Sequence, residues 1–329
     1  MNESGLDLSH LRHLQAWITY DQRADASARV AASIDKFLSA EGIVRSEDCD
    51  QPCRDNLRIL EAAGYVPLGP LLSPEQADET RAYFERTPCY AAHVAAKSDG
   101  IPRDPNGAAA AHPFGSYMLE EIVSAPHILE LANRPDVLAL AEAYLGCVPT
   151  LYSMNAWWSF PQTKEAERVT QMFHRDLDDF RFLALFVYLT DVDEGNGPHQ
   201  YIRGSHRPEI VHRYLIDNGR DEDEADGLIA DLFKGTGYAG RDLYPLHLDR
   251  RIDTIAGPAG SAFLADAYGL HRGVPPTGAR RLVCWIRYGL FENAASAEDK
   301  ITPVPRAAVA GRVPDDAKSN YVNRLIVGG

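Results

Sequence analysis

The first apolar pattern in the chain has the spacing of a helix. Apolar residues recur three or four positions apart in two groups, Leu8, Leu11, Leu14, Trp17 and Ile18, followed by Val30, Ile34, Phe37 and Leu38. This period places each group on one face of a helix. Gly42 then supplies a C-terminal stop signal. We therefore expect helical structure over residues 6–42, within an α-helical N-terminal extension at residues 1–50.

A polar segment containing Pro52 follows, and we interpret it as a linker onto the main domain, which we place at residues 51–295. The chain has five cysteines, Cys49, Cys53, Cys89, Cys147 and Cys284. Their number is odd and only the first two lie close together, which fits a reducing compartment better than a disulfide framework. No second Cys/His pair follows Cys49 and Cys53, so a zinc knuckle is not indicated.

The next pattern changes from a strand to a helix. Tyr65, Val66 and Leu68 predict a short strand. After it, Ser73 has the place of an N-cap, Pro74 that of the first helical residue, and Gln76 completes a capping box. These residues predict a strand, a turn and a helix in that order.

Residues 95–115 are rich in Gly, Pro, Ala and charge, and predict a long loop of the kind that often forms a lid. Two helices are expected next, His127–Asn133 and Pro135–Leu145, the second stopped by Gly146. An insertion into the main domain at residues 209–250 is charged and partly helical. The insertion could form part of a substrate lid, but we interpret its acidic run, DNGRDEDEADG, as a solvated surface.

The remaining apolar patterns are those of strands. They predict strands near residues 150–158, 181–190, 252–256, 261–265 and 282–291, with turn signals such as residues 193–198 between them. The main domain should therefore be mostly β with flanking helices, followed by a C-terminal tail at residues 296–329 that packs on it.

Composition narrows the classes of function. A net charge of −14 argues against nucleic-acid binding, which needs a basic surface. No apolar run is long enough to span a bilayer, and the N-terminus lacks the pattern of a secretory signal. We expect a soluble cytoplasmic protein that handles a small molecule. Nothing in the sequence indicates an oligomeric state.

One stretch, QMFHRDLDDFRFLALFVYL at residues 171–189, carries candidate metal chemistry. Because strand residues alternate sides, His174 and Asp176 should project from one face and Arg175 from the other. An imidazole and a carboxylate form two thirds of a 2-His-1-carboxylate triad, which binds Fe(II) and leaves positions open. His271 is our candidate for the second imidazole.

Other histidines fit this chemistry less well. His247 and Asp249 repeat the H-x-D spacing, but no strand pattern follows them directly. His206 could be a third ligand, although we interpret it as part of a turn, and His10, His13, His199 and His212 as ordinary polar or core residues. Residues 174–177 also spell the protein-kinase catalytic loop, but Arg181 stands where that loop needs Asn.

Two arginines begin the last predicted strand. A guanidinium grips a carboxylate with two parallel hydrogen bonds. Alternation allows only one of Arg280 and Arg281 to point inward, and we favour Arg281 because it shares a face with Trp285 and Arg287. Arg287 could be a second contact for an anion. Trp285 could line the same pocket, together with Asn155 and Trp157 on an earlier predicted strand.

Taken in order, these motifs resemble the phytanoyl-CoA dioxygenase-like (PhyH) family of Fe(II)/2-oxoglutarate-dependent oxygenases. The matching pieces are EAAGYVPLGPLLSPEQADETRAYFE, HRD followed by FVYLTDVDEGNGP, RGSH, AFLADAYGLHRG and ARRLV, and together they cover about residues 57–291. The resemblance implies a double-stranded β-helix (jelly-roll, cupin-like) core. It also implies that His174, Asp176 and His271 bind the iron and that Arg281 or Arg280 binds 2-oxoglutarate.

The resemblance further implies a reaction. Fe(II), 2-oxoglutarate and O2 would hydroxylate or desaturate a small-molecule substrate, with succinate and CO2 as co-products. Related halogenases lack the carboxylate ligand, so Asp176 favours hydroxylation or desaturation. The alternatives are a cupin-like metal enzyme that does not use 2-oxoglutarate and a non-catalytic jelly-roll binding protein.

Overall fold

A computed structural model of the chain describes residues 17–46, 49–107, 112–161, 171–233, 247–290 and 302–328. Parts of five predicted segments lie outside these residues. They are residues 6–16 of the first helical pattern, 108–111 of the long loop, 234–246 of the charged insertion, 291 of the last predicted strand, and 296–301 and 329 of the tail.

Most of the strands form one large antiparallel sheet, in the order β1-β9-β6-β11-β5-β4-β2-β3. Its members are β1 (Tyr65–Pro70), β2 (Cys89–Tyr90), β3 (Pro102–Arg103), β4 (Phe114–Ser116), β5 (Thr150–Ser159), β6 (Phe182–Tyr188), β9 (Ser261–Ala265) and β11 (Arg281–Gly289). A smaller antiparallel sheet has the order β10-β7-β8 and consists of β7 (His199–Ile202), β8 (Ile252–Ile255) and β10 (His271–Gly273). A parallel pair, β12 (Val304–Pro305) and β13 (Val327–Gly328), lies near the C-terminus.

Strand β11 shows why the two sheets form a sandwich. All nine of its residues are buried, and their side chains alternate between two apolar cores. Leu282 and Ile286 belong to the core shared with helices, whereas Val283 and Trp285 belong to a core shared with Tyr201 of the small sheet. This arrangement confirms the predicted jelly-roll core with flanking helices.

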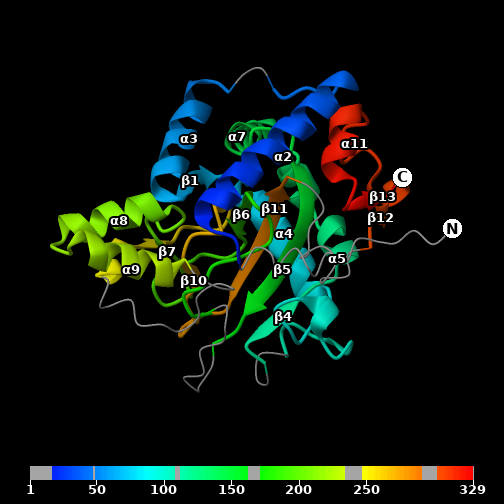
Figure 1. The fold of residues 1–329 in the computed structure, drawn as a ribbon. Helices are drawn as coiled ribbons and strands as arrows, with labels where there is room; N and C mark the ends of the chain where they lie inside the picture. The colour runs from blue at the N-terminus through cyan, green and yellow to red at the C-terminus, as the bar shows by residue number, and fades with distance from the viewer. Residues whose placement is uncertain are drawn as a thin grey trace.

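Helices cover the outer face of the large sheet (Figure 1). The helices that contribute to that core are α2 (Tyr20–Ala40), α3 (Gln51–Ala63), α4 (Pro74–Arg86), α5 (Leu119–Ser124), α6 (Ile128–Ala132), α7 (Pro135–Leu145) and α11 (Ala317–Asn323). Ala31 and Leu38 of α2 and Val322 of α11 join the same core, so both ends of the described chain pack against the sheet.

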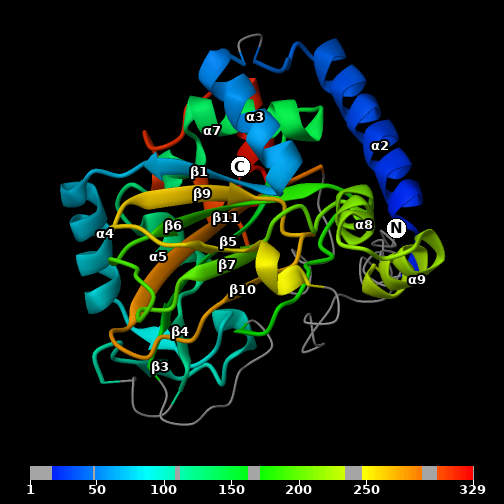
Figure 2. The same ribbon diagram turned by 90° about the vertical axis from the view of Figure 1, so that its left-hand side faces the viewer.

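Two helices of the charged insertion lie beside the small sheet. They are α8 (Pro208–Asp217) and α9 (Glu222–Leu232), and Figure 2 shows them on the opposite side of the strands from α4. Val211 and Leu215 pack with Ile202 of β7 in a third apolar core. The acidic run contains Asp221, the N-cap of α9, and acidic residues in the first helical turn, where the helix dipole favours negative charge.

The predicted linker around Pro52 is wrong. Helix α3 begins at Gln51, with the Asp50 side chain accepting a hydrogen bond from the Cys53 backbone N–H. Pro52 lies in the first turn, where a missing N–H has no cost. Cys49 and Cys53 flank this cap with their Cα atoms 5.2 Å apart and form a disulfide, which the cysteine pattern did not lead us to expect.

The predicted loop at residues 95–115 is only partly irregular. It contains a short 3-10 helix, η1 (Ala95–Lys97), the strand β3 and the first two residues of β4. Strand β4 pairs with β5, Phe114 opposite Ser159, and thereby brings the end of this segment to the edge of the central strands. The described residues also include the 3-10 helices η5 (Leu248–Arg251) and η6 (Arg306–Val309).

Candidate metal centre

The predicted metal ligands meet at the junction of the two sheets. His174 and His271 form a single β-bridge, in which each backbone N–H donates to the other residue's carbonyl at 3.0 and 2.9 Å. The backbone N–H of Asp176 donates to Ala267 at 2.9 Å. The predicted strand at His174 is therefore wrong, because this segment makes one bridge rather than a ladder. It is nevertheless extended enough to direct His174 and Asp176 the same way.

The three side chains converge. The His174 Nε2 lies 3.7 Å from Asp176 Oδ1, and the His271 Nε2 lies 3.9 Å from Asp176 Oδ2. One ligand atom from each residue lies within 4.8 Å of the other two. Two imidazole nitrogens and one carboxylate oxygen are the donor set of non-haem Fe(II) oxygenases, and the residues present fit such an ion.

Backbone carbonyls orient both imidazoles. The His174 Nδ1 lies 2.9 Å from the carbonyl oxygen of Met172, and the His271 Nδ1 lies 2.9 Å from that of Gly269. A carbonyl oxygen can only accept, so each Nδ1 must carry a proton and each Nε2 must present its lone pair to the centre. Burial and then the neighbouring His174 lower the pKa of His271 to about 4, which keeps its imidazole neutral.

Arg175, between the two ligands, points to the other side as alternation predicted. Its guanidinium lies 4.2 Å from the ring centre of Phe233 and 4.7 Å from that of Tyr268. It is buried, and burial lowers its pKa. Arg175 therefore anchors the ligand segment in the core instead of facing the metal centre.

The structure separates the two adjacent arginines. Arg281 is buried in the pocket beside the triad, where it donates to the Gly197 carbonyl and, at 3.2 Å, to the Ser159 hydroxyl. Arg280 points to the outside, pairs with Glu85 at 3.1 Å and lies over the Trp158 ring. Only Arg281 is placed to meet a ligand of the pocket.

Two of the predicted pocket residues, Arg287 and Asn155, form hydrogen bonds within the protein. Arg287 donates to Asp176 Oδ2 at 2.8 Å and to Asp178, so it binds the carboxylate of a triad residue rather than a substrate anion. The Asn155 amide donates to the His93 backbone carbonyl at 2.8 Å and does not line the pocket. Of the predicted pocket residues, Trp157 and Trp285 line the pocket, whereas Arg287 and Asn155 do not.

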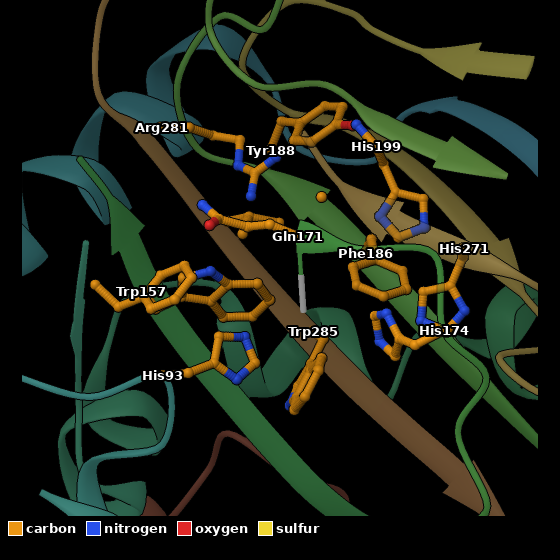
Figure 3. A pocket seen from close by; sticks show the side chains of 13 residues that line it. His93, Trp157, Gln171, His174, Phe186, Tyr188, His199, His271, Arg281 and Trp285 are labelled. Atoms are coloured by element: carbon orange, nitrogen blue, oxygen red, sulfur yellow. The ribbon is translucent and has the colours of Figure 1, made fainter. Parts of the chain in front are cut away.

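The pocket opens to solvent, spans about 490 Å³ with that open space included, and contains residues that the sequence patterns did not reveal (Figure 3). These are His93, Phe114, Gln171, Phe186, Tyr188 and His199. His199 was interpreted as an ordinary histidine, yet its ring lies 5.4 Å from that of His271 and nearly parallel to it. Its place after the turn at residues 193–198 was the available signal. His93 lies in an irregular segment whose sequence has no informative period.

The remaining histidine candidates lie elsewhere in the fold. His206 is buried with its Nε2 3.2 Å from the Glu61 carbonyl and follows Gly204, whose φ is +80°, so it belongs to a turn as predicted. His247 caps η5 with a φ of +54°. Neither joins the metal-binding group found among the described residues.

Comparison with known proteins gives one family and a set of distant structures. The sequence model of the family "Phytanoyl-CoA dioxygenase (PhyH)" matches residues 60–281, a span that includes the triad and ends at Arg281. No curated protein matches the chain. None of the described helices is both long and apolar enough to cross a membrane.

Three solved structures illustrate the similarity. EctD from S. alaskensis in its apo form has a TM-score of 0.46 and 17% identity, over 75% of this chain and 80% of its own. The non-heme alpha-ketoglutarate-dependent carbocyclase SnoK from nogalamycin biosynthesis has a TM-score of 0.44 and 17% identity, over 74% of this chain and 84% of its own. HygX from Streptomyces hygroscopicus, with nickel, 2-oxoglutarate and hygromycin B bound, has a TM-score of 0.43 and 14% identity, over 72% of this chain and 86% of its own.

Proposed function

Because the chain belongs to the phytanoyl-CoA dioxygenase family and is therefore an Fe(II)/2-oxoglutarate-dependent oxygenase, we propose that it hydroxylates a small-molecule metabolite. In this proposal His174, Asp176 and His271 hold Fe(II), and Arg281 binds 2-oxoglutarate. When bound, iron, 2-oxoglutarate and O2 supply the oxidising chemistry, and succinate and CO2 leave as co-products.

The observation that carries the proposal is the buried charge of Arg281. Its side chain is buried and, among the described residues, pairs with no carboxylate. Burial lowers the pKa of its guanidinium, which means that the charge is held at a cost. A buried cation without a partner is strongly unfavourable unless a ligand supplies the anion. The distal carboxylate of 2-oxoglutarate would supply it.

Neighbouring groups fix the orientation of the Arg281 guanidinium before the ligand binds. The Gly197 carbonyl and the Ser159 hydroxyl accept from its two terminal nitrogens, which fixes the plane of the guanidinium. Gly273 leaves room for it, since a Cβ atom there would lie 3.0 Å from Arg281 Nη2. A guanidinium fixed in this way loses little freedom when a carboxylate binds.

The test is anaerobic. Fe(II) and then 2-oxoglutarate are added to metal-free protein, and a weak visible charge-transfer band is expected only when both are present, with loss of the band on admission of air. Arg281→Met should weaken 2-oxoglutarate binding at least about 30-fold, because a buried ion pair is lost. Arg280→Met is the matched control and should leave binding unchanged.

Each other outcome has a meaning. Met is close to Arg in volume and removes an unpaired buried charge, so Arg281→Met should fold at least as stably as the parent. Metal binding without the band would favour a cupin-like enzyme that does not use 2-oxoglutarate. If no metal binds, a non-catalytic binding protein becomes the better explanation.

The carboxylate ligand gives a second prediction. Asp176→Ala should abolish succinate formation and reduce Fe(II) retention in equilibrium dialysis, because it removes the one anionic donor of the triad. Asp191→Ala is the control, because Asp191 is exposed and accepts a backbone hydrogen bond from Ala259. Robust turnover by Asp176→Ala would contradict the ligand assignment.

A further inference from the structure

The pocket has two chemically different sides. Figure 3 shows Arg281, Tyr188 and His199 on one side, and His93, Trp157 and Trp285 grouped on the other. The first side carries the buried guanidinium that we assign to 2-oxoglutarate. The second side consists of three aromatic rings and carries no charge.

The rings of this second side form a wall. Trp157 and Trp285 meet edge to face, with centroids 5.1 Å apart and planes at 69°. The His93 ring lies 4.6 Å from Trp157 and 5.4 Å from Trp285, again edge to face with each. Such contacts fix all three rings, so the wall is a preformed apolar surface of the kind that lines small-molecule sites.

His93 supplies the wall with both a hydrogen-bond donor and an acceptor, whereas each indole has an N–H donor alone. No described residue donates to or accepts from its ring nitrogens, although Asn155 holds its backbone carbonyl in place. Burial, followed by the charge of Arg287, lowers the pKa of His93 to about 3, so the imidazole is neutral. A neutral imidazole offers one N–H donor and one lone pair.

The charges around the wall argue against an ionic substrate. Arg287 lies over the Trp285 ring at 3.6 Å, but Asp176 and Asp178 already bind it, so it has little to offer an anion. The same guanidinium repels a cation from Trp285. Among the described lining residues Arg281 is the only charged side chain, and 2-oxoglutarate would neutralise it.

Resting on the oxygenase function proposed above, we propose that His93, Trp157 and Trp285 form the substrate subsite. It takes a small neutral molecule that places a saturated C–H surface against the two indoles and a hydroxyl or carbonyl group against His93. The hydrogen bond to His93 fixes which C–H bond is presented to the metal centre. His93 is thus a specificity-determining residue for the reaction.

The test uses three probes that share one saturated ring: cyclohexanemethanol, cyclohexanecarboxylate and protonated cyclohexanemethylamine. Each is titrated anaerobically at pH 7.5 into the protein loaded with Fe(II) and saturating 2-oxoglutarate, so that Arg281 is covered. Binding is followed by tryptophan fluorescence and by perturbation of the visible band. The alcohol should bind at least 5-fold more tightly than either ion.

Variants separate the hydrogen bond from the wall. His93→Phe keeps a ring and removes both nitrogens, so it should weaken binding of the alcohol about 5- to 10-fold. His93→Gln restores a donor and an acceptor and should recover most of that loss. Trp157→Phe should weaken all three probes, and His212→Phe, on α8 outside the pocket, should change nothing.

Tighter binding of either ion, or equal binding of the alcohol by the parent and His93→Phe, would overturn the proposal. The visible band is recorded in the same cuvette before each titration. If the band forms but the three probes do not bind in the expected order, the proposed subsite is wrong and the oxygenase function stands. If the band itself is absent from the parent, the proposed function fails first. Should His93→Phe not fold, the His93→Gln and Trp157→Phe titrations decide.

Discussion

At the scale of single residues, the carboxylate of Asp176 lies between the two histidines of the triad and Arg287. Its Oδ1 lies 3.7 Å from the His174 Nε2, while its Oδ2 accepts from Arg287 at 2.8 Å. Arg287 also binds Asp178 and lies over Trp285, and its side chain is only 6% exposed. Arg287 is therefore a positioning residue that fixes the carboxylate and joins it to the aromatic wall.

Arg287→Met should test this link. It leaves Asp178 as a buried carboxylate without its guanidinium and frees Asp176 to rotate, so the free energy of unfolding should fall by about 3 kcal/mol or more. Fe(II) affinity should fall about 10- to 100-fold. Urea unfolding and metal titration measure the two effects.

The chain offers a close control for that change. Arg280 also pairs with a carboxylate and lies over a tryptophan, but outside the pocket, where its side chain is 27% exposed. Arg280→Met should change stability by less than about 1 kcal/mol, as for other solvent-accessible pairs. Equal effects of the two variants on Fe(II) affinity would contradict the positioning role of Arg287.

At the scale of elements, helix α2 reaches the ligand segment although it lies outside the span of the family match. Its Arg23 is 3% exposed and donates to the carbonyls of Asp179 and Phe180, just after the triad aspartate. The same guanidinium lies 4.1 Å from the Tyr268 ring centre. The N-terminal helix thus braces the loop that carries Asp176 and Asp178.

Arg23→Met should loosen that loop. Two buried carbonyls lose a charged donor, which should lower the free energy of unfolding by about 1–3 kcal/mol and speed amide exchange in residues 176–180. Arg29→Met, on the same helix but 79% exposed at the side chain and paired with Asp25, should stay within about 0.5 kcal/mol of the parent. Unchanged exchange in Arg23→Met would show that α2 does not support the site.

Sequence patterns predicted the elements that carry their own signals. The capping box of Ser73 and Gln76 is present, and the long strands β5, β6 and β11 lie where apolar runs placed them. Helix α3 was missed although Asp50 and Pro52 mark its start, because polar residues and cysteines suggested a linker.

Short elements escaped prediction for a different reason. Strands β7 and β10 have four and three residues, too few to show a period, and they pair only because the sheets close around the pocket. The same closure brings His93 and His199 to the site. By contrast, the spacing of His174 and Asp176 and the alternation along β11 are local properties of the sequence. They therefore predicted that His174 and Asp176 point the same way and that Arg281 points inward.

At the scale of the whole molecule, folding withdraws four of the described histidines from water in neutral form: His199, His206 and His271 are buried and His93 is half-buried. Desolvation is the largest cause in each case, and it lowers the pKa of His93 to about 3, that of His271 to about 4, and those of His199 and His206 in the same direction. In the unfolded chain these imidazoles regain a pKa of about 6.5. Below that pH the unfolded state therefore binds more protons than the folded state.

The sign of this difference makes the fold sensitive to acid. Stability contributed by the neutral histidines is complete above about pH 6.5 and is lost as the pH falls toward 4, where His271 begins to charge in the folded state. At pH 5 the loss amounts to about 2 kcal/mol for each histidine that stays neutral.

Urea unfolding of metal-free protein at pH 7, 6 and 5 should show a steep decline in the free energy of unfolding. His93→Phe should flatten the decline, because a phenyl ring takes up no proton, whereas His212→Phe, at a half-exposed surface position, should not. A free energy of unfolding that stays constant from pH 7 to 5 would mean that the folded protein protonates these rings, and the neutral imidazole on which the subsite depends would be lost with it.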